Sequence, residues 1–277
     1  MHVMKQVKFF LLGVLLSAAT GGTWAADTTA AIEAEPAAAS SGKLYHPSAE
    51  PLAGLAAKMA LAKTNNRLLL VVLGGNWCHD SRALAARLYT APLDTLVNAS
   101  YETLFVDVGY LEKGRDVLTS LGIPVYYATP TVLIVDPVSG QVINTRDRHR
   151  WANASSIDMT ESVAYFSQFA ETGPAAAEAE NDPSLETLLD EIDAFEQLQA
   201  ERLYQAYGIL GPMLKAYKEG NPKAFREDLW NEVRDYRYQV PADLDALRTA
   251  ARERVASGET GIKLDYPVYP PFFWEVR

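Results

Sequence analysis

The pattern of apolar and polar positions divides the chain into two regions that differ in periodicity. Between residues 47 and 171, apolar runs alternate with segments of helical spacing. Six apolar residues, Leu68–Leu73, run directly into two glycines, which is typical of a strand buried on both faces of a parallel sheet. Further strands are predicted at 103–108, 131–136 and 141–145, and helices at 52–63, from 79 onward, at 116–121 and at 158–169. This order predicts an α/β fold, a small sheet sandwiched by helices.

The region 184–277 shows helical spacing without strand signals. Asp182-Pro183 places a cap residue and a proline at the start of a helix. We expect this helix to break at Gly208, Gly211 and Pro212, because glycine and proline disfavour a helix interior. Two further helices are expected, one opening at Asn221-Pro222 and one running from about Pro241 to Gly258. The C-terminal region is therefore predicted to be mostly α-helical.

An aromatic tail at 266–274 ends the chain. Two interpretations stay open for it. The tail either folds back onto the helices or forms a partner surface, because large exposed apolar patches are seldom without a role.

The N-terminus has the features of an export signal. Lys5 and Lys8 precede the apolar run 9–16, and small residues ending near Ala25 follow it. The run is too short to span a bilayer, so a cleaved signal peptide at 1–25 is predicted rather than a stable membrane anchor. The protein is accordingly expected to be exported, to the periplasm or an equivalent compartment. Two stretches rich in small and polar residues, 26–46 and 172–183, are predicted to be linkers.

Composition narrows the classes of function. The formal net charge of −10 makes nucleic acid a poor partner, because an acidic surface repels phosphate backbones. The chain contains one cysteine, Cys78, so it cannot form an internal disulfide. An odd cysteine in an exported chain indicates intermolecular pairing or a reactive thiol.

The stretch from Gly74 to Ser81 lies directly after the buried strand and directly before a helix. This placement puts the sulfur of Cys78 at a helix N-terminus, where unpaired N–H groups and the helix dipole stabilise a thiolate. Ser81 lies one helical turn further on, on the same face, so its hydroxyl is in reach of the sulfur. The alternative is a packed, inert thiol, since free cysteines are often buried.

The segment Trp77-Cys78-His79-Asp80-Ser81 resembles the active site of the thioredoxin superfamily, Trp-Cys-x-x-Cys, with Ser81 in place of the second cysteine. The segment Thr129-Pro130-Thr131, just before a predicted core strand, resembles the superfamily's cis-proline site. Pro124 is a rival for that position, but the strand does not follow it directly.

The resemblance implies a thioredoxin-like domain at 47–171. Cys78 would be the nucleophile and Ser81 would stabilise its thiolate. Thr129 and Pro130 would align the substrate, and Trp77 and His79 would frame the rim of the site.

Two departures from the superfamily pattern change the expected chemistry. Ser81 removes the resolving cysteine, and Val72 stands where the superfamily carries a buried acid. What the resemblance then implies is monothiol exchange with a cysteine-containing protein or a small-thiol disulfide. The alternative is a non-catalytic binding or chaperone-like module that uses the C-terminal helical region. A one-cysteine peroxidase is a weaker third reading, because Gly75 stands where a peroxidase carries threonine.

Two other polar features of the sequence are His79 and the basic segment 146–151. His79 lacks the cysteine and histidine neighbours of a zinc site, so neither a metal nor a cofactor is expected. One interpretation of the basic segment 146–151 is that it grips an anionic partner. The favoured interpretation is a solvated loop whose arginines pair with acidic residues, including some in the C-terminal region.

Overall fold

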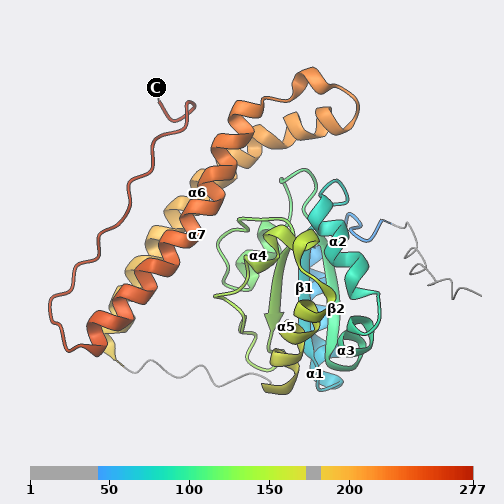
Figure 1. Cartoon of the computed structure of the whole chain (residues 1–277), viewed down its shortest axis with the longest axis horizontal. Helices are drawn as coiled ribbons and strands as arrows, with labels where there is room; N and C mark the ends of the chain where they lie inside the picture. Colours follow the sequence, from blue (N-terminus) through green and yellow to red (C-terminus); the bar gives the residue numbers. More distant parts are fainter. Residues whose placement is uncertain (1–42, 173–181, 277) are drawn as a thin grey trace, which may run out of the picture. The chain divides into compact units, whose positions relative to one another are not determined.

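A three-stranded sheet lies at the centre of the N-terminal region (Figure 1). The computed structural model describes residues 43–172 and 182–276. The predicted signal peptide at 1–25 lies outside the described residues, as do nearly all of the two predicted linkers. The elements around the sheet are α1 (Pro51–Thr64), β1 (Leu68–Gly74), α2 (His79–Leu88), α3 (Leu93–Ser100), β2 (Tyr101–Asp107), α4 (Arg115–Ser120), β3 (Thr131–Val135), the 3₁₀ helix η1 (Arg150–Ser156) and α5 (Met159–Thr172).

The sheet is mixed, with the strand order β2-β1-β3. The central strand β1 pairs in parallel with β2, where Leu68 lies opposite Tyr101, and antiparallel with β3, where Leu73 lies opposite Thr131. Every residue of β1 is buried, as its uninterrupted apolar run predicts. The sheet is therefore mixed, whereas the apolar run of β1 had indicated a strand of a parallel sheet.

The predicted strand at 141–145 is wrong. After β3, only Val142 forms a bridge, to Val135. The side chain of Asn144 takes over the pairing that a backbone would make. Its Oδ1 accepts from the backbone N of Ile134 at 2.7 Å, and its Nδ2 donates to the carbonyl of Val132 at 2.9 Å. A side-chain amide that satisfies both groups ends the ladder after a single bridge.

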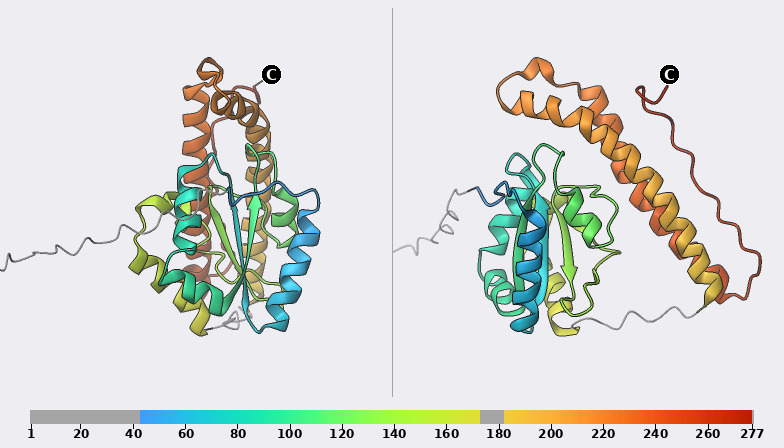
Figure 2. Two further views of the ribbon diagram at one scale, coloured as in Figure 1. Left: turned by 90° about the vertical axis from the view of Figure 1, so that its right-hand side faces the viewer. Right: turned by 180° about the vertical axis from the view of Figure 1, so that it is seen from behind.

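Helices cover both faces of the sheet (Figure 2). Alternate residues of β1 belong to two separate cores, because successive side chains of a strand point to opposite faces. Leu69, Val71 and Leu73 pack with α1, α4 and residues of the C-terminal helices. Leu70 and Val72 pack with α2, α3 and α5. This mixed α/β arrangement is compatible with a thioredoxin-like fold followed by a helical region.

The C-terminal region contains two long helices, α6 (Pro183–Lys218) and α7 (Glu227–Ala256), joined by the short 3₁₀ helix η2 (Pro222–Ala224). Asp182 caps α6 by accepting from the backbone N of Ser184 at 2.9 Å, as predicted. The two helices form an antiparallel hairpin (Figure 1).

The predicted breaks at Gly208, Gly211 and Pro212 are wrong, and so is the separate helix predicted from Pro241. Both prolines lie inside continuous helices. A proline removes one backbone hydrogen bond, but the apolar stripe continues on both sides of each proline. The buried residues that maintain the stripe are Tyr207, Leu210 and Leu214 in α6 and Val240, Leu244 and Leu247 in α7. Burial of this stripe outweighs the local preference of the prolines.

The aromatic tail folds back onto the hairpin. Tyr269 and Phe272 are buried, and both contact the ring of Tyr236 edge-on. Arg202 of α6 pairs with Glu275 at 2.8 Å and holds the end of the tail. For Tyr269 and Phe272, the interpretation that the tail folds back onto the helices is therefore confirmed.

Candidate active site

Cys78 is the N-cap residue of α2 and is partly exposed. Strand β1 ends at Gly74, and a short loop carries the chain to the helix, where the backbone N of Cys78 donates to the carbonyl of Gly75 at 3.0 Å. Arg82, one turn into the helix, donates from its guanidinium to the carbonyl of Asn76 at 2.9 Å. The sulfur therefore lies at a helix N-terminus, and the Arg82 guanidinium folds back over the adjoining loop.

Thr129 contacts the sulfur with two different groups. The Sγ of Cys78 donates to the backbone carbonyl of Thr129 at 3.1 Å. The hydroxyl of Thr129 donates to Sγ at 3.4 Å. The peptide bond between Thr129 and Pro130 is cis, the geometry that the resemblance predicts at this position. Pro130 and the loop before β3 thus lie opposite Cys78.

The hydroxyl of Ser81 has a different partner from the one expected. Ser81 is fully buried, and its Oγ accepts from the backbone N of Gly75 at 3.4 Å. Among the described residues, no hydrogen bond joins Ser81 to Cys78. Ser81 therefore ties α2 to the loop before Cys78, while the group that reaches the sulfur belongs to Thr129.

Trp77 is fixed by the loop that follows β2. Its Nε1 donates to the carbonyl of Gly109 at 2.6 Å, and its ring stacks on Tyr110 with 6.4 Å between centroids. His79 is the first residue of α2 and is exposed. The Trp77 ring is therefore held in place next to Cys78, whereas the His79 side chain is exposed to solvent.

Tyr45 is a site residue that sequence reasoning missed, because it falls in the range predicted to be a linker. It is 1% exposed, and its hydroxyl donates to the carbonyl of Ser81 at 3.2 Å. The amide of Asn76 pairs with both backbone groups of Tyr45, accepting from N at 3.3 Å and donating to O at 2.6 Å. Burial, together with the neighbouring Cys78, raises the pKa of Tyr45 well above its ordinary value, so the phenol stays protonated.

The long helix α6 contacts the loop that holds Trp77. A Cβ built on Gly211 would lie 2.5 Å from the carbonyl oxygen of Tyr110, so only glycine fits at this crossing. One turn earlier in α6, the hydroxyl of Tyr207 donates to the carbonyl of Tyr126 at 2.6 Å. The helical hairpin is therefore part of the scaffold that positions the wall of the site.

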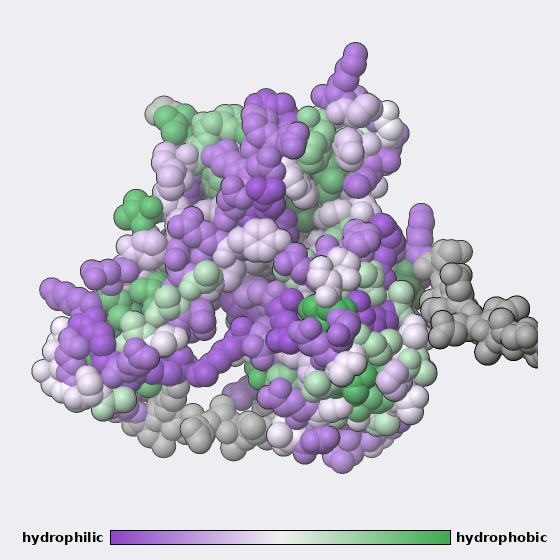
Figure 3. All heavy atoms as spheres, viewed as in Figure 1, coloured by the Kyte–Doolittle hydropathy of each residue, from purple (hydrophilic) through white to green (hydrophobic). Residues whose placement is uncertain are grey.

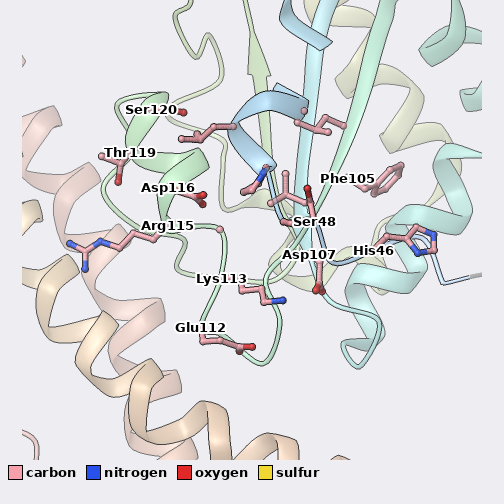
Figure 4. Close-up of a pocket in the computed structure, with 17 residues that line it drawn as sticks. His46, Ser48, Phe105, Asp107, Glu112, Lys113, Arg115, Asp116, Thr119 and Ser120 are labelled. Atoms are coloured by element: carbon pink, nitrogen blue, oxygen red, sulfur yellow. The ribbon is translucent and has the colours of Figure 1, made fainter. Parts of the chain in front are cut away.

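A separate groove of about 880 Å³ lies along β2, between α1 and α4 (Figure 4). His46, Ser48, Asp107 and Lys113 line it, whereas Cys78 does not. Burial raises the pKa of Asp107, against the opposing effects of its hydrogen bond from Gly109 and of the Lys113 charge. Side chains of both charge signs line the groove, and Cys78 is not among them.

Two further features are absent from the described ranges. Residues 43–172 and 182–276 include no helix with the length and apolar character needed to cross a membrane. The same ranges hold no group of three or more histidine, cysteine or carboxylate side chains arranged around a metal position.

The chain resembles a solved structure but no known family. No protein-family model and no curated protein sequence matches the chain. Among solved structures, the chain is similar to the crystal structure of a disulphide isomerase from Xylella fastidiosa Temecula1, at 25% identity and a TM-score of 0.43. The match covers 46% of this chain and 97% of the other.

Proposed function

We propose that this protein is a monothiol thiol–disulfide exchange protein of the thioredoxin-like type, with Cys78 as its nucleophile. The observation that carries the proposal is the position of the Cys78 sulfur. It is partly exposed at the start of α2 and lies within hydrogen-bond distance of Thr129, next to the cis-proline. The substrate class would be a disulfide of a cysteine-containing protein or of a small thiol. Export to the periplasm belongs to the same proposal.

The exchange proceeds in two balanced steps. The Cys78 thiolate attacks one sulfur of the substrate disulfide, forms a mixed disulfide and releases the other substrate sulfur as a thiolate. A low-molecular-weight thiol then attacks the mixed disulfide, which frees Cys78 and leaves that thiol joined to the remaining substrate sulfur. The second thiol comes from outside because Ser81 stands at the resolving position and the chain has one cysteine.

Three groups of the protein support the first step. The helix N-terminus and the Thr129 hydroxyl stabilise the thiolate, since donors to the charged form favour it. The Trp77 ring is held in place by Gly109 and Tyr110, so it limits the directions from which a disulfide approaches. The Thr129 carbonyl, which accepts from the thiol in this structure, becomes free to pair with a substrate when the sulfur is ionised.

The test is adduct formation with a chromogenic aromatic disulfide, followed by addition of reduced glutathione. We expect the native protein to release one equivalent of thiol and to react faster than the same chain unfolded in urea, where Cys78 lacks the helix and Thr129. Mass spectrometry should place the adduct on Cys78, and glutathione should remove it. Cys78→Ser is the matched control and should form no adduct. A native reaction no faster than that of the unfolded chain would refute the proposal.

A second candidate is a non-catalytic binding module. The observation that favours it is the donation of the thiol to the Thr129 carbonyl, because this bond stabilises the neutral, non-nucleophilic form. The face shown in Figure 3 is largely hydrophilic, and its apolar residues form small separate patches. A broad apolar docking surface is not seen on that face. A slow native reaction in the adduct experiment would favour this second candidate.

A further inference from the structure

The loop that carries Thr129 lacks a hydrogen-bonded backbone ladder. Residues 121–130 connect α4 to β3, and within the described ranges residues 124–129 form no hydrogen bond with another backbone group. Tyr126 and Tyr127 in this loop are nevertheless buried. Buried carbonyl groups in folded proteins normally have a partner, so the partners of these two residues must come from side chains.

The C-terminal hairpin of α6 and α7 supplies these partners. The hydroxyl of Tyr207, in α6, donates to the carbonyl of Tyr126 at 2.6 Å. The Nε of Arg237, in α7, donates to the carbonyl of Tyr127 at 2.5 Å. The two hairpin side chains also contact each other, since the Arg237 guanidinium lies 5.6 Å from the centre of the Tyr207 ring. Both helices therefore hold the short stretch of main chain that lies two and three residues before Thr129.

The side chains of the same two loop residues are also anchored in the hairpin. The ring of Tyr126 stacks on that of Tyr207 with 5.1 Å between centroids, and the hydroxyl of Tyr127 donates to Glu196 of α6 at 3.4 Å. Burial raises the pKa of Tyr207 to about 12, against the opposing effect of the Arg237 charge, so its hydroxyl remains a donor at neutral pH. The loop therefore depends on the hairpin for both its backbone and its side-chain contacts.

A displacement of this stretch reaches the sulfur of Cys78 through one intervening residue. Ala128 separates the stretch from Thr129, and its carbonyl accepts from the hydroxyl of Thr131 at 2.7 Å. The carbonyl and the hydroxyl of Thr129 lie 3.1 Å and 3.4 Å from the Cys78 sulfur. Because hydrogen bonds weaken steeply with poor geometry, a small shift of the loop changes both contacts.

We propose that the C-terminal hairpin is a positioning element for the reaction of Cys78, and that Tyr207 and Arg237 are positioning residues that act through Thr129. The inference rests on the proposed exchange reaction, because the rate of that reaction is the quantity that the hairpin sets. It gives the two long helices a role in the chemistry of the site that is distinct from binding a partner.

The test uses thiol release from an aromatic disulfide by the full chain. Tyr207→Phe removes the hydroxyl and keeps the ring that stacks on Tyr126. We expect it to slow the reaction about threefold to tenfold, the range expected for a weakened hydrogen bond at the sulfur. Arg237→Met keeps the apolar stem of the side chain, removes the donor and should have an effect of similar size. Arg237 is half-buried, so this second variant is expected to fold normally.

Two residues of the same hairpin provide matched controls. Tyr236 is a buried tyrosine whose hydroxyl donates to the Oε1 of Gln199 at 2.9 Å, inside the hairpin. Arg234 lies three residues before Arg237, is exposed and pairs with Asp235. Tyr236→Phe and Arg234→Met should leave the rate within about twofold of the wild-type rate, since neither change removes a contact with the loop.

A double-mutant cycle separates positioning of the sulfur site from a general weakening of the fold. If the hairpin acts through Thr129, Thr129→Val should slow the Tyr207→Phe protein less than about twofold, although it slows the wild type about threefold to tenfold. Wild-type rates in Tyr207→Phe and Arg237→Met, or a full effect of Thr129→Val in the Tyr207→Phe background, would overturn the inference. The proposed function fails by a different result, a native wild type that reacts no faster than the unfolded chain.

Discussion

Cys78 and Thr129 are far apart in the sequence, yet Thr129 contacts the sulfur with two groups of opposite effect. Its carbonyl accepts from the thiol at 3.1 Å and stabilises the neutral form. Its hydroxyl donates to the sulfur at 3.4 Å and stabilises the thiolate. The two contacts are separable by mutation, because only the second depends on the Thr129 side chain.

Replacing Thr129 with valine is expected to slow the reaction of Cys78 with disulfides about threefold to tenfold. The change removes the hydroxyl donor but keeps the side-chain volume and the carbonyl, and a lost hydrogen bond of this kind is worth about 1 kcal/mol. The rate is measured by thiol release from an aromatic disulfide at fixed pH. Thr129→Ser keeps the hydroxyl and should restore most of the rate. Equal rates in the valine and serine variants would show that the hydroxyl plays no part.

Ser81→Ala is expected to affect stability rather than reactivity. The substitution leaves the buried N–H of Gly75 without its acceptor, which costs about 1 kcal/mol of unfolding free energy. The Cys78 sulfur keeps its contacts with Thr129, so the rate of thiol release should stay within about twofold of the wild-type rate. Urea unfolding and the disulfide reaction together decide the matter. A large drop in rate at unchanged stability would return to Ser81 the role of stabilising the thiolate.

Much of the α/β region could be predicted because its local and tertiary signals agree. Leu68–Leu73 is apolar at every position, and the structure buries every one of these residues between two cores. The strand predicted at 141–145 failed because one side chain, that of Asn144, occupies the place of a backbone partner. The periodicity of apolar residues alone does not reveal that a side-chain amide replaces a backbone partner.

The long-range features could not be read from local patterns. Pro212 and Pro241 predict helix ends, yet both lie inside helices whose buried stripes continue past them. Tyr45 lies within the stretch 26–46 that was predicted to be a linker, and only its distant partner Asn76 explains its burial. The basic segment 146–151 was predicted to be a solvated loop, which is wrong for Arg148 and Trp151, because both are buried. The pairing of its arginines with the C-terminal region was predicted, but the specific pair, Arg148 with Glu196, required the structure.

Gly211→Ala and Gly208→Ala should have opposite effects, although both replace a glycine in α6. A Cβ on Gly211 would lie 2.5 Å from the carbonyl oxygen of Tyr110, whereas nothing lies within 4 Å of one on Gly208. Overpacking at Gly211 is expected to cost about 1–3 kcal/mol of unfolding free energy. Alanine at Gly208 should add up to about 1 kcal/mol through helix propensity.

The same pair of variants tests whether α6 positions the site. Tyr110 stacks on Trp77, so a displaced Tyr110 loop should slow the reaction of Cys78 in Gly211→Ala and not in Gly208→Ala. Both quantities are measured on the same samples, by urea unfolding and by thiol release. Destabilisation at Gly211 with an unchanged reaction rate would confine α6 to a structural role.

His149 should make the protein sensitive to acid. Its pKa in the folded protein is about 3, because of burial and of the nearby Arg148 and Arg248, against an ordinary value of about 6.5. Between these two pH values the unfolded chain binds a proton that the folded chain does not, so stability falls as the pH decreases from about 6.5 to 3. The full contribution of one such group is a slope of about 1.4 kcal/mol per pH unit. The free energy of unfolding is measured with urea across this pH range for the wild type and for His149→Gln. It should depend less steeply on pH in the variant, because the glutamine amide does not titrate and still accepts from Arg148. His79→Gln, which removes an exposed histidine, is the matched control, and a slope unchanged in His149→Gln would place the acid sensitivity elsewhere.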